Sequence, residues 1–233
     1  MLKKVIFLII IGSYTLTFCQ TNVSVEAILK KAEKYYAAEN EYSYITAYKF
    51  FESEKSNISI ENKQGAILRL NNVNYQKMDF TETFNFGNQA MVIDNKSKTV
   101  YITKNVPKES VFSFASYLKN FPKKKIILHP DYWICEMAIS KNALSQYYKI
   151  RFYIDKKDFS LYKQVFYISG NQEIESKGKK INLVNPRLEI ILRKKTPNSL
   201  EDRMRIKKDN YFTLNKGKIV VSNKYKNYKV ISN

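Results

Sequence analysis

Few residues of this chain are of the types that carry out acid–base or nucleophilic chemistry. The sequence contains one histidine, His129, which lies beside Pro130. A single imidazole excludes a two-histidine metal site and leaves no second imidazole for proton transfer. Cys135 lies in an alternating stretch, 133–137, which predicts a strand with the thiol on the face opposite Ile134. We expect His129 in a turn and Cys135 as a buried free thiol, not an activated Cys–His pair.

Other catalytic motifs are missing from the sequence. No serine stands in a G-x-S-x-G pattern, there is no G-x-G-x-x-G or Walker loop, and six glycines are too few for a phosphate-binding loop. The paired carboxylates at 173/175 and 201/202 lie in charged segments that indicate solvated surface. We therefore predict no catalytic residue, no metal, no cofactor and a protein that is not an enzyme.

Residues 1–19 have the three parts of a secretory signal peptide: two lysines, an apolar run at Val5–Ile11 and a small-residue exit. A run this short cannot cross a hydrocarbon layer of roughly 30 Å as a stable helix. We expect cleavage after Cys19, with Thr17 and Cys19 at the −3 and −1 positions. The alternative is a lipidated Cys19, but Phe18 is bulkier than the residue that lipoprotein signals place there. The prediction is export to the periplasm.

The rest of the chain, 20–233, is long enough for one domain with a hydrophobic core, and no interior linker divides it. If Cys19 is removed, the remaining cysteine cannot form an internal disulfide, so the fold must depend on its core. The net charge of +19 predicts attraction to anionic surfaces such as acidic lipid headgroups. The alternative is that this charge only reflects a lysine-rich composition and implies no anionic partner. Because the basic residues are dispersed and no nucleic-acid-binding motif accompanies them, no nucleic-acid partner is expected.

Two segments have helical periodicity. At 22–39, Ser24 can cap the helix, Glu26 lies in the first turn, and apolar residues recur at helical spacing. After Pro107, residues 109–121 show a second apolar face. Both faces must be buried against other elements.

Most of the remaining chain alternates with a period of two, which is typical of strands. Residues 94–98 are polar and turn-forming, which indicates a hairpin loop and a meander. Two charged segments, 171–180 and 194–208, are expected to be mobile connections. The predicted strands are 42–51, 57–61, 65–70, 74–78, 81–85, 89–93, 99–103, 125–128, 132–139, 146–154, 161–169, 188–193, 212–214, 218–221 and 225–231.

The expected strands are rich in aromatic residues, with 18 Tyr, 14 Phe and one Trp in the chain. Such residues form an ordinary core in most β proteins. They would also suit a curved sheet that encloses apolar space for a ligand beneath two helices. Both interpretations remain open from the residues alone.

The order of elements resembles the LolA/LppX-like family of periplasmic lipoprotein and lipid carriers. The resemblance consists of a signal peptide, an N-terminal helix and a strand meander, with short matching stretches at 65–75, 91–101, 152–155 and 161–164. It implies a half-open β-barrel whose helices form a lid over an apolar cavity for acyl chains. The best-known carriers have an Arg-Pro pair after the glycine-led strand, whereas Leu70 follows Arg69 here.

The predicted fold is mainly β (α+β), a single strongly curved antiparallel sheet or half-open barrel with an N-terminal and a mid-chain helix packed on its concave side. The predicted function is binding or carrying of a lipid, acyl chain or lipidated peptide, aided by attraction to an anionic membrane surface. The alternative is a structural or assembly component that acts through an envelope protein partner. The predicted ligand-contacting residues are Phe84, Phe86, Met91, Phe112, Phe114, Tyr117 and Leu118.

Overall fold

The computed structural model describes seven stretches of the chain and leaves the predicted signal peptide, Cys19 and residues 109–111 outside them. The described residues are 23–71, 73–104, 112–139, 145–176, 179–195, 199–215 and 218–232. The helices are α1 (Val25–Ala38), α2 (Ala115–Asn120), α3 (Leu200–Arg205) and the 3-10 helices η1 (Lys208–Asn210) and η2 (Asn223–Tyr225). The strands are β1 (Glu41–Phe51), β2 (Ser59–Leu70), β3 (Val73–Met78), β4 (Thr81–Phe86), β5 (Gln89–Asp94), β6 (Thr99–Lys104), β7 (Lys123–Leu128), β8 (Tyr132–Ala138), β9 (Tyr147–Asp155), β10 (Leu161–Ile168), β11 (Asn171–Ser176), β12 (Lys179–Val184), β13 (Arg187–Lys195), β14 (Phe212–Asn215), β15 (Lys218–Val221) and β16 (Lys229–Ser232).

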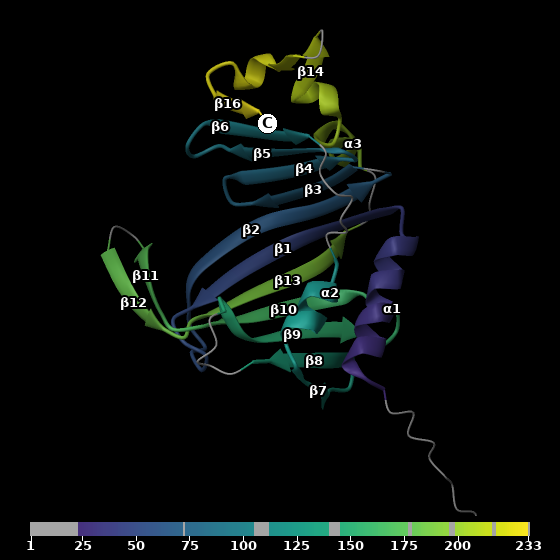
Figure 1. Cartoon of the computed structure of the whole chain (residues 1–233), viewed down its shortest axis with the longest axis vertical. Coiled ribbons are helices and arrows are strands. Elements are labelled where there is room, and N and C mark those ends of the chain that lie inside the picture. Colours follow the sequence, from purple (N-terminus) through teal and green to yellow (C-terminus); the bar gives the residue numbers. More distant parts are fainter. Residues whose placement is uncertain are drawn as a thin grey trace, which may run out of the picture.

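Twelve of the strands form one large curved sheet that does not close into a barrel, which confirms the predicted fold class (Figure 1). The strand order is β16-β6-β5-β4-β3-β2-β1-β13-β10-β9-β8-β7. All pairings in this sheet are antiparallel except that between β16 and β6, which is parallel. The predicted strands at 57–61 and 65–70 are one continuous strand, β2, and the predicted strand at 225–231 is divided between η2 and β16.

Helix α1 forms as its sequence predicts. The Ser24 hydroxyl accepts a hydrogen bond from the backbone N–H of Ala27 (3.1 Å), so it satisfies one of the amides that a helix start leaves unpaired. The apolar stripe is buried against the sheet, where it contacts β7, β8 and β9. Its buried residues are Val25, Ile28, Leu29, Ala32 and Tyr36.

Helix α2 is shorter than the predicted helix at 109–121. Residues 112–114 are not helical, and the helix begins at Ala115. Phe112 and Phe114 precede it and are both buried. Residues two apart lie on different sides of a helix, so a non-helical backbone allows both rings to enter the same core. A carboxylate oxygen of Glu33 in α1 accepts a hydrogen bond from the Phe114 backbone N–H (2.7 Å) and joins this start to α1.

The two segments predicted to be mobile connections contain regular structure, so that prediction is wrong. Residues 171–176 and 179–184 pair as the antiparallel strands β11 and β12, and the apolar residues Ile174, Ile181 and Leu183 stand among polar and charged neighbours in the sequence. The segment 194–208 contains the end of β13 and helix α3. The Ser199 hydroxyl caps α3 by accepting from the Asp202 backbone N–H (3.1 Å), and Asp202 itself is buried.

Strand β2 divides the molecule into two hydrophobic cores on opposite faces of the sheet. Ile67 belongs to the first core, with α1, Phe112 and Phe114, whereas its neighbour Leu68 belongs to the second. Consecutive side chains of a strand point to opposite faces. The first core therefore covers one face of the half built from β1, β13 and β7–β10. The second covers the other face of β2–β6, where residues 199–232 pack (Figure 1).

Leu29 lies in the centre of the first core and is fully buried. We expect Leu29→Ala to lower the free energy of unfolding by about 2–5 kcal/mol, because it removes buried methyl groups and leaves a cavity. Urea denaturation measures the change. The exposed neighbour Lys30 is the control, and Lys30→Ala should change stability by less than about 0.5 kcal/mol. Equal effects of the two substitutions would contradict the position of the first core.

Candidate functional site

The structure separates the seven predicted ligand-contacting residues into two groups that do not meet. Phe112, Phe114, Tyr117 and Leu118 belong to the first core, and Phe84, Phe86 and Met91 belong to the second. Because the two cores lie on opposite faces, these groups cannot line one cavity between them. The four residues around α2 remain together in the first core. Phe114 and Tyr117 contact β9 or β10, whereas Phe112 contacts α1 and β1.

The first core contains a layer of aromatic rings between α2 and the sheet. The Phe114 ring lies 4.9 Å from that of Phe152, and the Tyr117 ring lies 5.4 Å from Phe152 and 6.3 Å from Phe166, measured between centroids. Phe112 stacks on Tyr36 of α1 at 3.8 Å. The rings of Phe114 and Tyr117 therefore pack against β9 and β10, and the Phe112 ring packs against α1.

In the first core, the hydroxyls of Tyr36 and Tyr44 are hydrogen-bonded, whereas the Tyr42 hydroxyl is buried without a partner among the described residues. The Tyr36 hydroxyl donates to the Tyr44 hydroxyl (3.4 Å) and accepts from the Leu161 backbone N–H (2.9 Å). Burial raises the pKa of both tyrosines well above the ordinary value. These hydroxyls stay protonated at neutral pH, so they serve as structural donors and not as bases.

The second group of predicted residues, Phe84, Phe86 and Met91, packs in the second core with residues from the C-terminal part of the chain. Phe84 and Phe86 stack with their ring centroids 5.6 Å apart. The Phe84 ring lies 4.2 Å from Tyr211, and the Phe86 ring lies 6.0 Å from Phe212. Residues 199–232 therefore cover these side chains, and their packing explains why Phe84 is fully buried.

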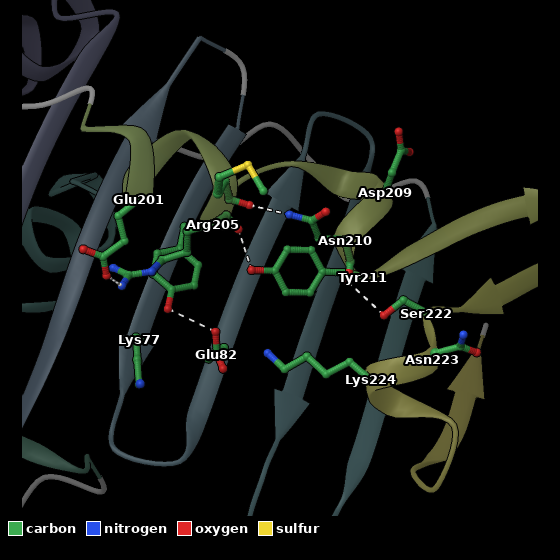
Figure 2. Close-up of a pocket in the computed structure, with 12 residues that line it drawn as sticks. Lys77, Glu82, Glu201, Arg205, Asp209, Asn210, Tyr211, Ser222, Asn223 and Lys224 are labelled. Carbon is green, nitrogen blue, oxygen red and sulfur yellow. Dashed lines mark hydrogen bonds and ion pairs between the residues drawn. The ribbon is translucent and has the colours of Figure 1, made fainter.

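A polar cleft of about 770 Å³ lies between this C-terminal segment and strands β3 and β4 (Figure 2). We call it the C-terminal cleft. Three basic and three acidic side chains line it, which suits a polar ligand or peptide better than an acyl chain. The lining residues are Tyr75, Lys77, Glu82, Glu201, Met204, Arg205, Asp209, Asn210, Tyr211, Ser222, Asn223 and Lys224.

Glu82 is at the centre of the hydrogen bonds in the C-terminal cleft. It accepts from the Tyr75 hydroxyl (3.1 Å) and from the Asn95 side-chain amide (3.2 Å). Burial, followed by the negative charge of Glu82, raises the pKa of Tyr75 and of Tyr211. Arg205 forms an ion pair with Glu201 and lies 5.5 Å from the centroid of the Tyr75 ring (Figure 2). Several of the charges are thus already paired within the protein.

The sequence alone does not reveal the C-terminal cleft, since its walls come from residues 75–82 and 201–224. The paired carboxylates Glu201 and Asp202 were expected in a solvated loop. Glu201 is exposed as predicted, although it lies on α3 and lines the cleft, whereas Asp202 is buried, so the prediction is wrong for Asp202. A helix start was indicated by Ser199 and the acidic residues that follow it. That signal could have located α3, but not the strands against which it packs.

The histidine and the described cysteine, the residues with the greatest chemical reactivity, do not line the C-terminal cleft. His129 is in the turn between β7 and β8, where its Nδ1 accepts a hydrogen bond from the Asp131 backbone N–H (3.2 Å). Cys135 is buried in the first core, and burial raises the pKa of its thiol to about 12. Among the described residues, no group of three His, Cys, Asp or Glu side chains could hold a metal ion. None of the described helices is long and apolar enough to span a membrane.

No protein-family model matches the sequence, and no curated protein matches it. Solved structures do resemble it. The crystal structure of an uncharacterized conserved protein from Thermus thermophilus has a TM-score of 0.50 and 11% sequence identity, and the match covers 89% of this chain and 98% of that one. The two proteins share a fold. At this identity the likeness shows the fold alone.

LolA-like proteins are among the solved structures that this chain resembles, as the sequence predicts. A LolA superfamily protein from Nitrosomonas europaea matches with a TM-score of 0.33 and 13% identity over 80% of this chain and 99% of that one. The MucA/MucB complex of Pseudomonas aeruginosa matches with a TM-score of 0.40 and 9% identity over 85% of this chain and 63% of that one.

In a Cys19→Ser variant, Cys135 is the only thiol left in the chain. We expect it to react with a thiol-reactive dye at pH 8 far more slowly in the folded protein than in urea, because the folded thiol is buried and has a pKa of about 12. The ordinary pKa of a cysteine thiol is 9.0. The contribution of the Cys135 thiol to the free energy of unfolding should therefore decline as the pH rises from about 9 to 12. Equal labelling rates in folded and unfolded protein would contradict the burial.

Proposed function

We propose that this chain is an exported, non-catalytic protein of the bacterial cell envelope that binds an acyl chain of a lipid, lipoprotein or lipidated peptide between α2 and the sheet. The main support is the aromatic layer formed by Phe114, Tyr117, Phe152 and Phe166 beneath a very short helix. Helix α2 has six residues, no side-chain cap and no fully buried residue. A helix of this length has little stability of its own.

The energetics of such binding require no covalent step. If α2 moves, the apolar faces of Phe152 and Phe166 become available, and an acyl chain can replace the rings that covered them. Each buried methylene contributes about 0.8 kcal/mol. A long chain can therefore offset the contacts that α2 loses, while the protonated thiol of Cys135 and the turn position of His129 support a function without catalysis.

The charge and the predicted signal peptide support a location in the periplasm. A net charge of +19 attracts acidic lipid headgroups, which would bring the protein to the membrane surface where acyl ligands are exchanged. The LolA-like resemblance agrees with this location. Residues 1–19 supply the export signal in this proposal.

Trp133 provides a direct test, since it is the only tryptophan and packs against the first core. Lipids with brominated acyl chains should quench its fluorescence, and native mass spectrometry of protein purified from a bacterial envelope should show a lipid-sized adduct. We expect Tyr117→Lys to weaken acyl binding at least about tenfold, because Tyr117 is partly buried against the first core and a lysine covered there by an acyl chain must lose hydration.

Ser116→Lys is the matched control, as Ser116 is exposed on the same helix and should tolerate the charge. Unchanged binding by Tyr117→Lys would show that the ligand does not lie beneath α2. If wild-type protein shows neither quenching nor an adduct, and lipids do not shift its melting temperature, acyl binding is excluded.

A second function, binding of an envelope protein partner, is favoured by the C-terminal cleft. Its volume of about 770 Å³ and its charges of both signs suit a polar peptide segment. Crosslinking in cells should then recover one stoichiometric protein partner, and Lys224→Glu at the cleft should reduce the yield. Lys226→Glu is the control, since Lys226 is exposed nearby and does not line the cleft. Equal yields for both variants would contradict this function.

A further inference from the structure

The large sheet ends in an edge strand, β7, at the lower end of the molecule (Figure 1). Strand β7 pairs with β8 on one side, and no described strand pairs with its other side. Alternate backbone N–H and C=O groups of an edge strand point away from its neighbour. An extended segment of another chain can therefore join the sheet here through backbone hydrogen bonds.

The opposite end of the same sheet already holds a short strand in this way. Strand β16 pairs with β6 in parallel over four residues, 229–232. None of its side chains is buried, so the pairing with β6 is mainly a backbone contact. The preceding residue Tyr225 is fully buried and tethers β16 to the molecule. A separate partner at β7 lacks such a tether, so its side chains must supply further contacts.

One face of β7 carries more positive charge than its neighbours neutralise. Lys123 and Lys125 are both exposed, and they share this face because they are two residues apart in a strand. Lys125 forms an ion pair with Glu136 of β8 (3.0 Å), but that carboxylate is also paired with Arg151 (2.6 Å). Lys123 forms no ion pair with a described residue. An acidic side chain can therefore approach Lys125 while Arg151 still neutralises Glu136.

The other face of β7 is more apolar. Lys124 on this face is already paired with Glu26 of α1 (2.8 Å). Ile126 packs against the first core, and Leu128 is 82% exposed. Apolar side chains of an added strand beside these two residues would remove exposed hydrocarbon from water. The two faces of β7 therefore favour acidic and apolar side chains at alternating positions of the partner.

The charge of β7 disfavours a second copy of this chain as the partner. Pairing of two β7 edges would bring the lysines of both copies together, and like charges on neighbouring strands are destabilising. Lysines on edge strands commonly prevent such association. The same lysines attract a strand of opposite charge. They therefore discriminate between the chain itself and an acidic partner.

We propose that the free edge of β7 binds an extended segment of a partner protein in which acidic and apolar residues alternate. The segment extends the sheet through backbone hydrogen bonds. Its carboxylates lie beside Lys123 and Lys125, and its apolar side chains lie beside Ile126 and Leu128. None of these four residues lines the C-terminal cleft, and the proposal does not depend on acyl binding.

The probe is a fluorescently labelled peptide of about six residues, an ordinary strand length, that alternates Glu and Val. Wild-type protein should bind it in fluorescence anisotropy, and added salt should weaken the binding because the charges are exposed. The double variant Lys123→Glu/Lys125→Glu should weaken binding at least about tenfold. A peptide that alternates Lys and Val should bind this variant instead, because both charges are then reversed.

Lys104→Glu/Lys226→Glu is the matched control. Both lysines are exposed in the other half of the molecule, so this variant changes the net charge equally and leaves β7 intact. It should bind the acidic peptide within about twofold of wild type, since distant exposed charges are screened. Equal losses in the two double variants would show that only net charge matters, and the β7 site would be wrong.

N-methylated peptides test the backbone pairing separately from the charge. Only alternate amides of an added strand point toward its neighbour. Methylation of one alternate set should abolish binding, and methylation of the other set should preserve it. Hydrogen exchange should also slow at residues 123–128 when the unmodified peptide is bound. Equal effects of the two methylation patterns, or unchanged exchange at β7, would overturn strand pairing.

Vesicles that contain acidic lipids provide the competing result. If wild-type protein binds these vesicles but not the peptide, and Lys123→Glu/Lys125→Glu reduces vesicle binding, the lysines attract a membrane and the proposal is wrong. Absence of binding to both probes would also overturn it. Neither result affects the acyl site beneath α2, which the brominated lipids test independently.

Discussion

The strict alternation of side chains along a strand is the constraint on which the rest of this structure depends. At β2, Ile67 points to the face that α1 and α2 cover, and Leu68 points to the face that residues 199–232 cover. A large curved sheet with one continuous core would need its cover on a single face. In this chain the two halves of the sheet are instead covered on opposite faces, so each cover stabilises a different half of the sheet.

This division separates the regions that can bind partners. The aromatic layer beneath α2 lies on the face of the sheet that the first core covers. The C-terminal cleft is formed by the cover of the other half, where Tyr75 and Tyr211 also belong to the second core. An acyl ligand and a protein partner would therefore contact different cores, and binding of one does not require the other to leave.

The buried tyrosines differ in whether their hydroxyl groups are hydrogen-bonded. The Tyr36 hydroxyl is paired with Tyr44 and with a backbone amide, and the Tyr75 hydroxyl is paired with Glu82. These hydrogen bonds offset the cost of burying polar groups and fix the surrounding side chains. The hydroxyls of Tyr42, Tyr48 and Tyr225 are also buried, but none of them has a hydrogen-bond partner among the described residues.

The sequence by itself determined the elements whose signals are local. The cap at Ser24 and the apolar stripe of α1, the period-two strands and the burial of Cys135 were all predicted, as was the mainly β fold. Only the tertiary structure decided that Phe84 and Phe114 lie on opposite faces, that β11 pairs with β12, and that Gly65 packs closely against Thr46 and Tyr48. Periodicity reports which residues of one element share a face. Which elements meet on that face depends on strand register and pairing between distant parts of the chain, which no local pattern contains.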